Sequence, residues 1–157
     1  MSVGRPAPSL SVANRQRAVR LDLRWLRKFA ESILPVCLQE CGDGAFALAQ
    51  LEEVAIAIVS DRTMAGLHVQ FMNIAGATDV ITFADGDIAI SAETARNAAA
   101  EFGHRVEEEL ALYIVHGLLH LNGFDDTTPR AAARMRKVQE RIWRAGREQL
   151  PHLRSET

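Results

Sequence analysis

The fold is decided by residues 78–91, which read TDVITFADGDIAIS. Residues 78–83 are rich in β-branched and aromatic side chains, and this composition predicts a strand. Asp85-Gly86 is a turn signal, and residues 87–91 predict another strand, close enough to the first to pair with it as a hairpin. After this stretch the apolar residues take the period of a helix, so the sequence changes here from sheet to helices.

Two more strands are expected upstream of this hairpin. Residues 53–60 (EVAIAIVS) are nearly all apolar and largely β-branched, which predicts a buried strand. Residues 9–14 predict a short strand that continues through residues 18–21. Residues 61–72 predict a helix, and the candidates for its packed face are Met64, Leu67, Val69 and Phe71.

The remaining segments are expected to be helices. Asp22 is suited to cap a helix that runs to about Glu40, and residues 42–44 (GDG) end it. Further helices are predicted at about residues 92–102, 106–121 and 128–148. This order of elements predicts an α+β fold in which helices pack on a small mixed sheet. We expect residues 1–157 to form a single domain.

The composition is that of an ordinary globular domain. Hydrophobic residues make up 48% and charged residues 24% of the chain, which argues against disorder, collagen and coiled coil. Because no run of about 18 apolar residues occurs and the N-terminus lacks a continuous apolar stretch, we expect neither a transmembrane helix nor a signal peptide. Cys37 and Cys41 are interpreted as reduced core or semi-core residues of a cytoplasmic protein. Trp25 and Trp143 are also expected in or near the core.

The formal net charge of −2 conceals a segregation of charge along the chain. Residues 1–28 carry a net charge of +6, residues 29–129 a net −13, and residues 130–157 a net +5. Seven basic side chains occur between positions 130 and 147. Two interpretations of this run stay open: an RNA surface that contacts phosphates, or a solvated helix face. An acidic middle attracts metal ions and repels RNA, so the basic ends are expected to supply attraction for a polyanion.

Candidate catalytic chemistry is concentrated in residues 116–126, HGLLHLNGFDD. His116 and His120 are four positions apart, so on a helix they differ by about 40° around the axis and about 6 Å along it. Both imidazoles can therefore bind one metal ion. The spacing resembles the zincin protease motif, but Gly117 stands where that motif has its glutamate, and glycine cannot act as a general base.

A carboxylate can complete this set. Gly123 suits the left-handed position just past a helix end, where the chain reverses and can bring Asp125 or Asp126 towards the histidines. Two imidazoles and one carboxylate form a known catalytic zinc set, with a fourth position open to water. The other interpretation is that the histidines share a helix face by chance and the aspartates cap the turn.

These residues resemble a known family. The run at 116–126 is similar to the His-Gly-x-Leu-His-Leu-x-Gly-Tyr-Asp-His signature of the YbeY family, the bacterial rRNA maturation endoribonucleases. Residues 78–83 are similar to the family's Pro-Thr-Asp-Val-Leu-Ser-Phe strand, and residues 86–91 to its Gly-Asp-Ile-x-Ile-Ser strand. Residues 108–110 (EEL) fall where the family has a glutamate-rich entry to its metal helix. The resemblance covers residues 50–127 well and the rest of the chain by element order.

The resemblance implies a single-strand-selective, metal-dependent endoribonuclease that acts in maturation of the small-subunit rRNA 3′ end and in ribosome quality control. By motif position, His116, His120 and Asp126 would hold one zinc ion per chain, at the C-terminal end of a central helix. Asp126 stands where the family usually has histidine, and it adds one negative charge to the ligands. Asp125 matches the family aspartate, which implies support of the ligands or proton transfer. The implied partners are RNA and the ribosome, with no membrane.

One departure from the family concerns an arginine before the Thr-Asp-Val strand, which is thought to bind or activate the RNA phosphate. Aligned without a gap, this chain has Met72 there, which offers neither charge nor donors. Such a loss typically costs several kcal/mol of transition-state stabilisation, so full nuclease activity is left open. His68, one helical turn earlier, could approach the same place, and it joins Thr78 and Asp79 as a candidate for substrate binding. Two alternatives also stay open: a minimal metallopeptidase, which Gly117 disfavours, and a non-catalytic, zinc-containing, ribosome-associated protein.

Overall fold

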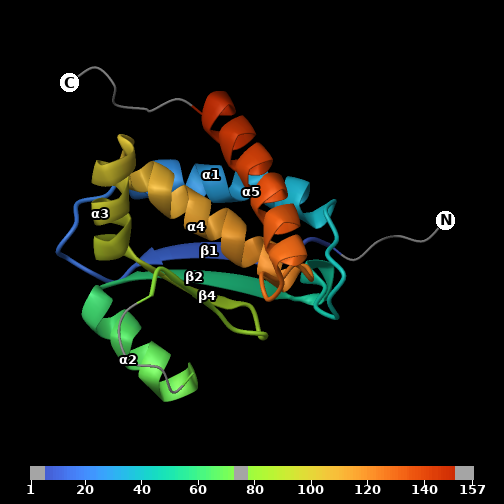
Figure 1. Cartoon of the computed structure of the whole chain (residues 1–157). Coiled ribbons are helices and arrows are strands. Elements are labelled where there is room, and N and C mark those ends of the chain that lie inside the picture. The colour runs from blue at the N-terminus through green and yellow to red at the C-terminus, as the bar shows by residue number, and fades with distance from the viewer. Residues whose placement is uncertain (1–5, 73–77, 151–157) are drawn as a thin grey trace.

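The computed structural model describes residues 6–72 and 78–150, and a four-stranded sheet lies at its centre (Figure 1). The strands are β1 (Ser9–Asn14), β2 (Glu53–Val59), β3 (Val80–Thr82) and β4 (Asp87–Ser91). Their order is β1-β2-β4-β3, with β1, β2 and β4 parallel. β3 pairs antiparallel with β4, as the predicted hairpin requires. The sheet is therefore mixed, and the predicted α+β class is confirmed. The terminal parts of the predicted single domain, residues 1–5 and 151–157, lie outside the described residues.

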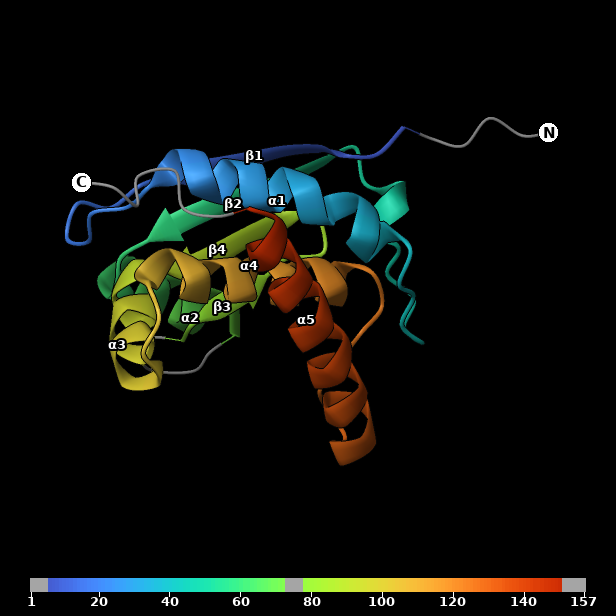
Figure 2. The same cartoon turned by 90° about the horizontal axis from the view of Figure 1, so that it is seen from above.

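Helices cover both faces of this sheet. Within the described residues they are α1 (Leu23–Leu38), α2 (Asp61–Met72), α3 (Ala92–Phe102), α4 (Val106–Leu121) and α5 (Pro129–Gln149), with a short 3₁₀ helix η1 (Leu48–Gln50). Figures 1 and 2 show α1 and α4 over one face of the sheet and α2 against the other. α5 packs across α1 and α4. Each predicted helix is present within about two residues of its expected bounds. No helix in the described ranges has the length and apolar character that crossing a bilayer requires.

Alternate side chains of the strands enter two different layers. The main core, under α1, α4 and α5, takes the isoleucines of β2 and β4: Ile56, Ile58, Ile88 and Ile90. The opposite face carries the smaller Ala57 and Ala89, where Met64 of α2 packs with Val59 and Ile81 in a separate cluster. Because successive strand residues point to opposite faces, the bulky residues decide which face holds the main core.

Helix α2 buries less of its predicted packed face than the sequence indicates. Met64 is fully buried and Leu67 is half-buried, as predicted. The prediction was wrong for Val69 and Phe71, which are 51% and 57% exposed. Val69 lies about 140° around the helix from Met64, which turns it towards solvent. Phe71 keeps the face of Met64 but lies in the last turn, where its ring meets Phe83 edge to face with 5.1 Å between centroids.

Residues 18–21 do not continue β1, so that prediction was also wrong. The strand ends at Asn14, and the buried side chain of Gln16 then holds a turn. Its Oε1 accepts a hydrogen bond from Val19 N (2.9 Å), and its Nε2 donates to Val19 O (2.9 Å) and to Asn14 Oδ1 (2.8 Å). The amide thus satisfies backbone groups that a strand would have paired.

The main core fixes α1 and α5 against α4. Asp22 caps α1 as predicted, since its Oδ1 accepts a hydrogen bond from Trp25 N (3.1 Å). Trp25 and Phe29 stack inside this core with 5.4 Å between ring centroids. α5 approaches α1 closely at Gly146, where an added Cβ would lie 2.7 Å from the Phe29 ring. Trp143 is buried as well, so both tryptophans are core residues, as expected.

Candidate metal centre

The predicted metal helix is α4, and both of its ends are fixed by hydrogen bonds. At the start, Glu108 Oε1 accepts a hydrogen bond from Arg105 N (2.9 Å), as in a capping box. At the end, Gly123 has a φ of +93°, the left-handed conformation that the sequence predicts. Phe124 N then donates to Leu119 O (3.0 Å). This reversal brings the chain back alongside the last turn of the helix.

A buried amide, Asn122, ties this turn to the end of α1. Its Oδ1 accepts a hydrogen bond from Leu48 N (3.0 Å), and its Nδ2 donates to Cys37 O (2.9 Å) and to Glu40 O. The sequence analysis missed this residue. The available signal was a polar side chain directly after an apolar helix, in the variable position of the signature. Of the two cysteines, Cys37 is a core residue, as expected, and burial raises the pKa of its thiol to about 12, whereas Cys41 is exposed.

The loop after α1 packs backbone to backbone on the same turn. Gly42 N donates to Asn122 O (3.0 Å), and Gly44 N donates to Gly123 O (2.8 Å). An added Cβ on Gly42 would lie 2.2 Å from the carbonyl carbon of Gly123, so this approach requires glycine. Two segments far apart in the sequence therefore hold the turn that carries the aspartates.

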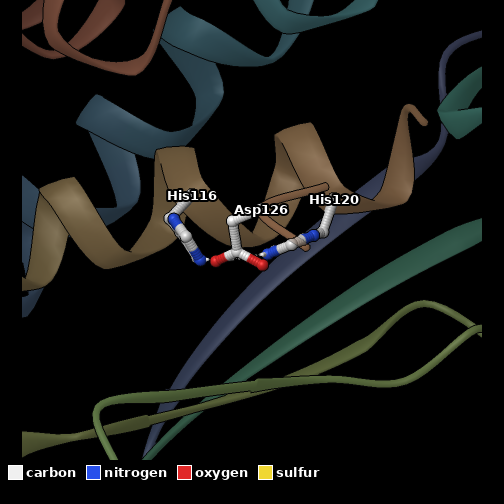
Figure 3. A group of neighbouring side chains, drawn as sticks. All are labelled: His116, His120 and Asp126. Carbon is white, nitrogen blue, oxygen red and sulfur yellow. Dashed lines mark hydrogen bonds and ion pairs between the residues drawn. The ribbon is translucent and has the colours of Figure 1, made fainter. Parts of the chain in front are cut away.

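His116 and His120 lie one turn apart on the same side of α4 (Figure 3). Nδ1 of His116 lies 2.7 Å from Gln139 Oε1 of α5, and Nδ1 of His120 lies 3.0 Å from Phe124 O. Because both neighbours are oxygen acceptors, each Nδ1 carries a proton and each Nε2 of the neutral ring keeps a lone pair. The two Nε2 atoms are 3.0 Å apart.

This arrangement fits a bound cation. With both protons on Nδ1, neither Nε2 can donate to the other, so their approach is repulsive unless a positive ion lies between them. Two nitrogens at this separation can both reach one ion at about 2.1 Å, the usual zinc–imidazole distance. Ligand atoms of His116, His120 and Asp126 all lie within 4.8 Å of one another, and Figure 3 shows the carboxylate between the two rings. The donor set therefore suits a divalent metal ion such as zinc.

The two neighbouring aspartates take different positions. Asp126 belongs to the ligand cluster, with its Oδ2 4.0 Å from His120 Nε2. Asp125 lies beside the cluster, where its Oδ1 accepts hydrogen bonds from Thr127 N (3.0 Å) and Thr127 Oγ1 (2.7 Å). These bonds lower the pKa of Asp125. Burial, and then the neighbouring His116, lower the pKa of His120, which favours the neutral imidazole that a metal requires.

The two histidines of the cluster line a cavity of about 640 Å³. Phe46, Met72 and Phe83 contribute to its walls, from the loop after α1, the end of α2 and the end of β3. Met72 is 45% exposed and Phe46 is 56% exposed. Among the described lining residues there is no lysine or arginine. The cavity therefore joins an apolar wall to a polar end that carries the two candidate metal-binding histidines.

The other candidate binding residues lie away from this lining. None of His68, Thr78 and Asp79 is among the described residues that form the cavity wall. His68 is half-buried on α2, and Asp79 is exposed just before β3. Asp79 Oδ1 accepts hydrogen bonds from Val80 N (2.8 Å) and Thr78 Oγ1 (3.4 Å), so it caps the start of the strand. Their role in substrate binding stays a prediction.

Gly117 lies where α4 crosses the sheet. An added Cβ there would be 2.9 Å from Ile88 Cδ1 and 3.0 Å from Ile88 Cγ2. A glutamate at this position would require Ile88 to shift. The general base of a zincin protease is absent from the sequence, and the contact with Ile88 disfavours any larger residue at this position.

Comparisons with known proteins show the family of the chain and a similar fold. A family profile described as "Endoribonuclease YbeY" matches residues 11–146. The chain is 39% identical over 146 residues to the endoribonuclease YbeY of a Roseiflexus species, covering 80% of this chain and 91% of that protein. It is 31% identical over 149 residues to the endoribonuclease YbeY of Heliobacterium modesticaldum, covering 82% and 87% respectively. The solution structure of TM1509 from Thermotoga maritima has a similar fold, with a TM-score of 0.57, 22% identity, and 94% and 99% of the two chains covered.

The fold and the cluster define an α+β protein with a candidate two-histidine, one-carboxylate metal centre at the C-terminal end of its central helix. The chain belongs to the YbeY endoribonuclease family. The resemblance carried by residues 78–91 and 116–126 is thereby confirmed.

Proposed function

We propose that this protein is a zinc-dependent endoribonuclease that cuts single-stranded RNA in the maturation of ribosomal RNA. Membership of the family supports the endoribonuclease activity and the role in rRNA processing. The observation that carries the proposal is the convergence of two Nε2 lone pairs and the Asp126 carboxylate, with both histidines in the wall of a cavity of about 640 Å³. The proposal extends to the 3′ end of the small-subunit rRNA, to ribosome quality control and to association with the ribosome.

Zinc held by His116, His120 and Asp126 would supply Lewis-acid polarisation of a phosphate oxygen and a water of lowered pKa. The chain itself keeps the donors in position. Gln139 Oε1 and Phe124 O accept hydrogen bonds from the two Nδ1–H groups, which fixes both rings and directs each Nε2 to the cluster. Because the Asp126 carboxylate replaces a neutral imidazole, we expect a weaker Lewis acid than in a three-histidine site.

Asp125 is suited to accept a proton from the attacking water. Its carboxylate lines the cavity beside His120, and the bonds from Thr127 fix its orientation. The carboxylate is ionised at neutral pH, as a proton acceptor has to be, and its lowered pKa makes it a weaker base than an ordinary aspartate. Thr78, Asp79 and His68 would contact the RNA farther from the cleaved bond, since they lie outside the cavity lining.

A second candidate function is that of a zinc-containing, ribosome-associated protein without nuclease activity. The lack of lysine and arginine in the described lining favours it, because phosphoryl transition states are stabilised by cationic contacts. In that case the protein binds one zinc ion per chain and co-sediments with ribosomes, while RNA cleavage stays at background. The metallopeptidase hypothesis has no comparable support, because Gly117 packs against Ile88 where a general base is needed.

The test is cleavage of labelled single-stranded and duplex RNA by the wild type, His120→Ala and Asp126→Asn, with zinc content measured on the same samples. We expect both variants to lose most of their zinc and about 100-fold or more of the single-strand cleavage. Glu101→Gln is the matched control, because it neutralises an exposed carboxylate on α3. Equal cleavage by the wild type and His120→Ala, or no cleavage by the zinc-loaded wild type, would contradict the proposal.

A further inference from the structure

Two cavities meet at the turn that follows α4. The metal-side cavity and a second cavity of about 240 Å³ share Gly123, Phe124 and Asp125 in their walls. The formal charge of a divalent ion in the first cavity is balanced by Asp125 and Asp126, so this centre alone attracts a polyanion only weakly. Its described lining adds no lysine or arginine. Cationic contacts to an RNA strand therefore have to come from a neighbouring surface.

The second cavity offers such contacts from the first turns of α5. Beyond the shared turn, its walls are formed by Asp43, Thr128, Arg130, Ala131 and Arg134. Arg134 is held in place: it donates to Cys41 O (2.9 Å), lies 3.4 Å from an Asp43 carboxylate oxygen and stacks over the Phe124 ring at 5.0 Å. The ion pair with Asp43 offsets the charge of Arg134, so this residue mainly shapes the wall.

Arg130 differs from Arg134 in having its charge available. Its side chain is exposed and makes no ion pair or hydrogen bond within the described parts of the chain. The other acid in this cavity, Asp125, is engaged with Thr127. The guanidinium of Arg130 therefore keeps its fork of donors, which matches the geometry of a phosphate.

We propose that Arg130 binds a backbone phosphate of the RNA in this second cavity, next to the nucleotide that occupies the metal-side cavity. The inference rests on the proposed function, since it takes RNA as the substrate. The inference defines a path for the RNA strand across the site. The path runs from the apolar wall at Phe46 and Met72, past the ligand cluster, to α5. It also supplies, from another helix, a cation that the described lining of the metal-side cavity lacks.

Helix geometry extends this path along α5 and provides a control. Lys137, seven residues after Arg130, lies within about 20° of it around the axis and about 10 Å along it. Lys137 is also exposed, so a strand leaving the second cavity meets another cation on the same stripe. Arg136 is exposed on the same helix but lies about 120° away from Arg130, and it does not line the cavity.

The test measures binding of a short fluorescent oligouridylate at several salt concentrations, in a His120→Ala background that prevents cleavage. Arg130→Gln should weaken binding about three- to tenfold at low salt and reduce the slope of log K against log[salt] by about 0.7, the value for one phosphate contact on a single strand. Arg130→Lys should keep the slope, because it keeps the charge. Arg136→Gln should change the affinity and the slope by less than half as much.

Equal effects of Arg130→Gln and Arg136→Gln would overturn the inference, and so would oligouridylate binding that does not depend on salt. Failure of the proposed function gives a different result: the zinc-loaded wild type would bind the RNA through Arg130 and leave it uncut. Conversely, a wild type that cleaves RNA, with an unchanged KM in Arg130→Gln, would remove the phosphate subsite and leave the nuclease proposal standing.

Discussion

On one face of the sheet, α1, α4 and α5 enclose isoleucines, Trp25 and Phe29 in a continuous core, whereas on the other face α2 covers alanines and buries Met64. The candidate metal ligands belong to the first side, since His116 and His120 lie on α4. The position that departs from the family pattern, Met72, lies at the end of α2. A residue on α4 is fixed by packing on several sides, while the last turn of α2 is fixed on few. We therefore expect the same substitution to have different effects on the two sides.

The largest difference should appear on truncating a phenylalanine on each side. Phe29→Ala removes a ring that is 0% exposed and stacked on Trp25, which should lower the free energy of unfolding by about 3–5 kcal/mol. Phe71→Ala removes an exposed ring with an edge contact to Phe83, and should cost less than about 1 kcal/mol. Urea unfolding of both variants measures the difference, and equal losses would show that α2 is held as firmly as α1.

A smaller difference in stability loss is expected when two polar side chains that connect helices, Asn122 and Asp61, are each replaced by alanine. Asn122→Ala leaves Leu48 N and Glu40 O without this partner in a buried site, and it removes one of the two hydrogen bonds to Cys37 O, which should cost about 2–4 kcal/mol. Asp61 of α2 accepts hydrogen bonds from two hydroxyl groups at a half-buried site, so Asp61→Ala should cost about 1 kcal/mol.

Zinc binding sharpens this second comparison. Asn122 holds the turn that carries Asp126, so Asn122→Ala should also weaken zinc binding, by about tenfold, as loss of a supporting contact typically does. Asp61→Ala should leave zinc affinity unchanged, because Asp61 is not in contact with the cluster. Isothermal titration of the folded variants tests this, and an unchanged zinc affinity in Asn122→Ala would mean that the turn does not depend on the amide.

The order of strands and helices along the chain could be predicted from the sequence, because each element follows from local periodicity and from the residues at its ends. The isoleucines at alternate positions of β2 and β4 and the cap at Asp22 needed no long-range information. The errors have local causes that a pattern does not record. Gln16 uses its side chain in place of a strand partner, and Phe71 lies in the last turn of α2, where its ring meets Phe83 and stays exposed.

In the candidate site, too, the features that depend on neighbouring residues could be predicted and those that depend on distant residues could not. The spacing of His116 and His120 and the reversal at Gly123 were predictable, because both depend on residues within one helical turn. Spacing alone left Asp125 and Asp126 open, and the family resemblance implied Asp126 as the ligand. Asp126 lies in the cluster and Asp125 beside it, and the role of each stays a prediction. Asn122 was missed because its partners are 74 to 85 residues away in the sequence.

The smallest effects should come from adding one methyl group to a glycine in each helix. Gly117→Ala in α4 places a Cβ 2.9 Å from Ile88 Cδ1, so Ile88 has to shift, and we expect a net loss of about 1 kcal/mol. Gly66→Ala in α2 places a Cβ with no described neighbour within 4 Å. Alanine there removes the conformational cost of a helical glycine and should stabilise the protein by about 0.5–1 kcal/mol. Thermal unfolding should show melting temperatures that shift in opposite directions for the two variants. Gly117→Ala should also weaken zinc binding, because position 117 lies between the two candidate ligands. If both variants were stabilised alike, the contact between α4 and the sheet would be no tighter than that of α2.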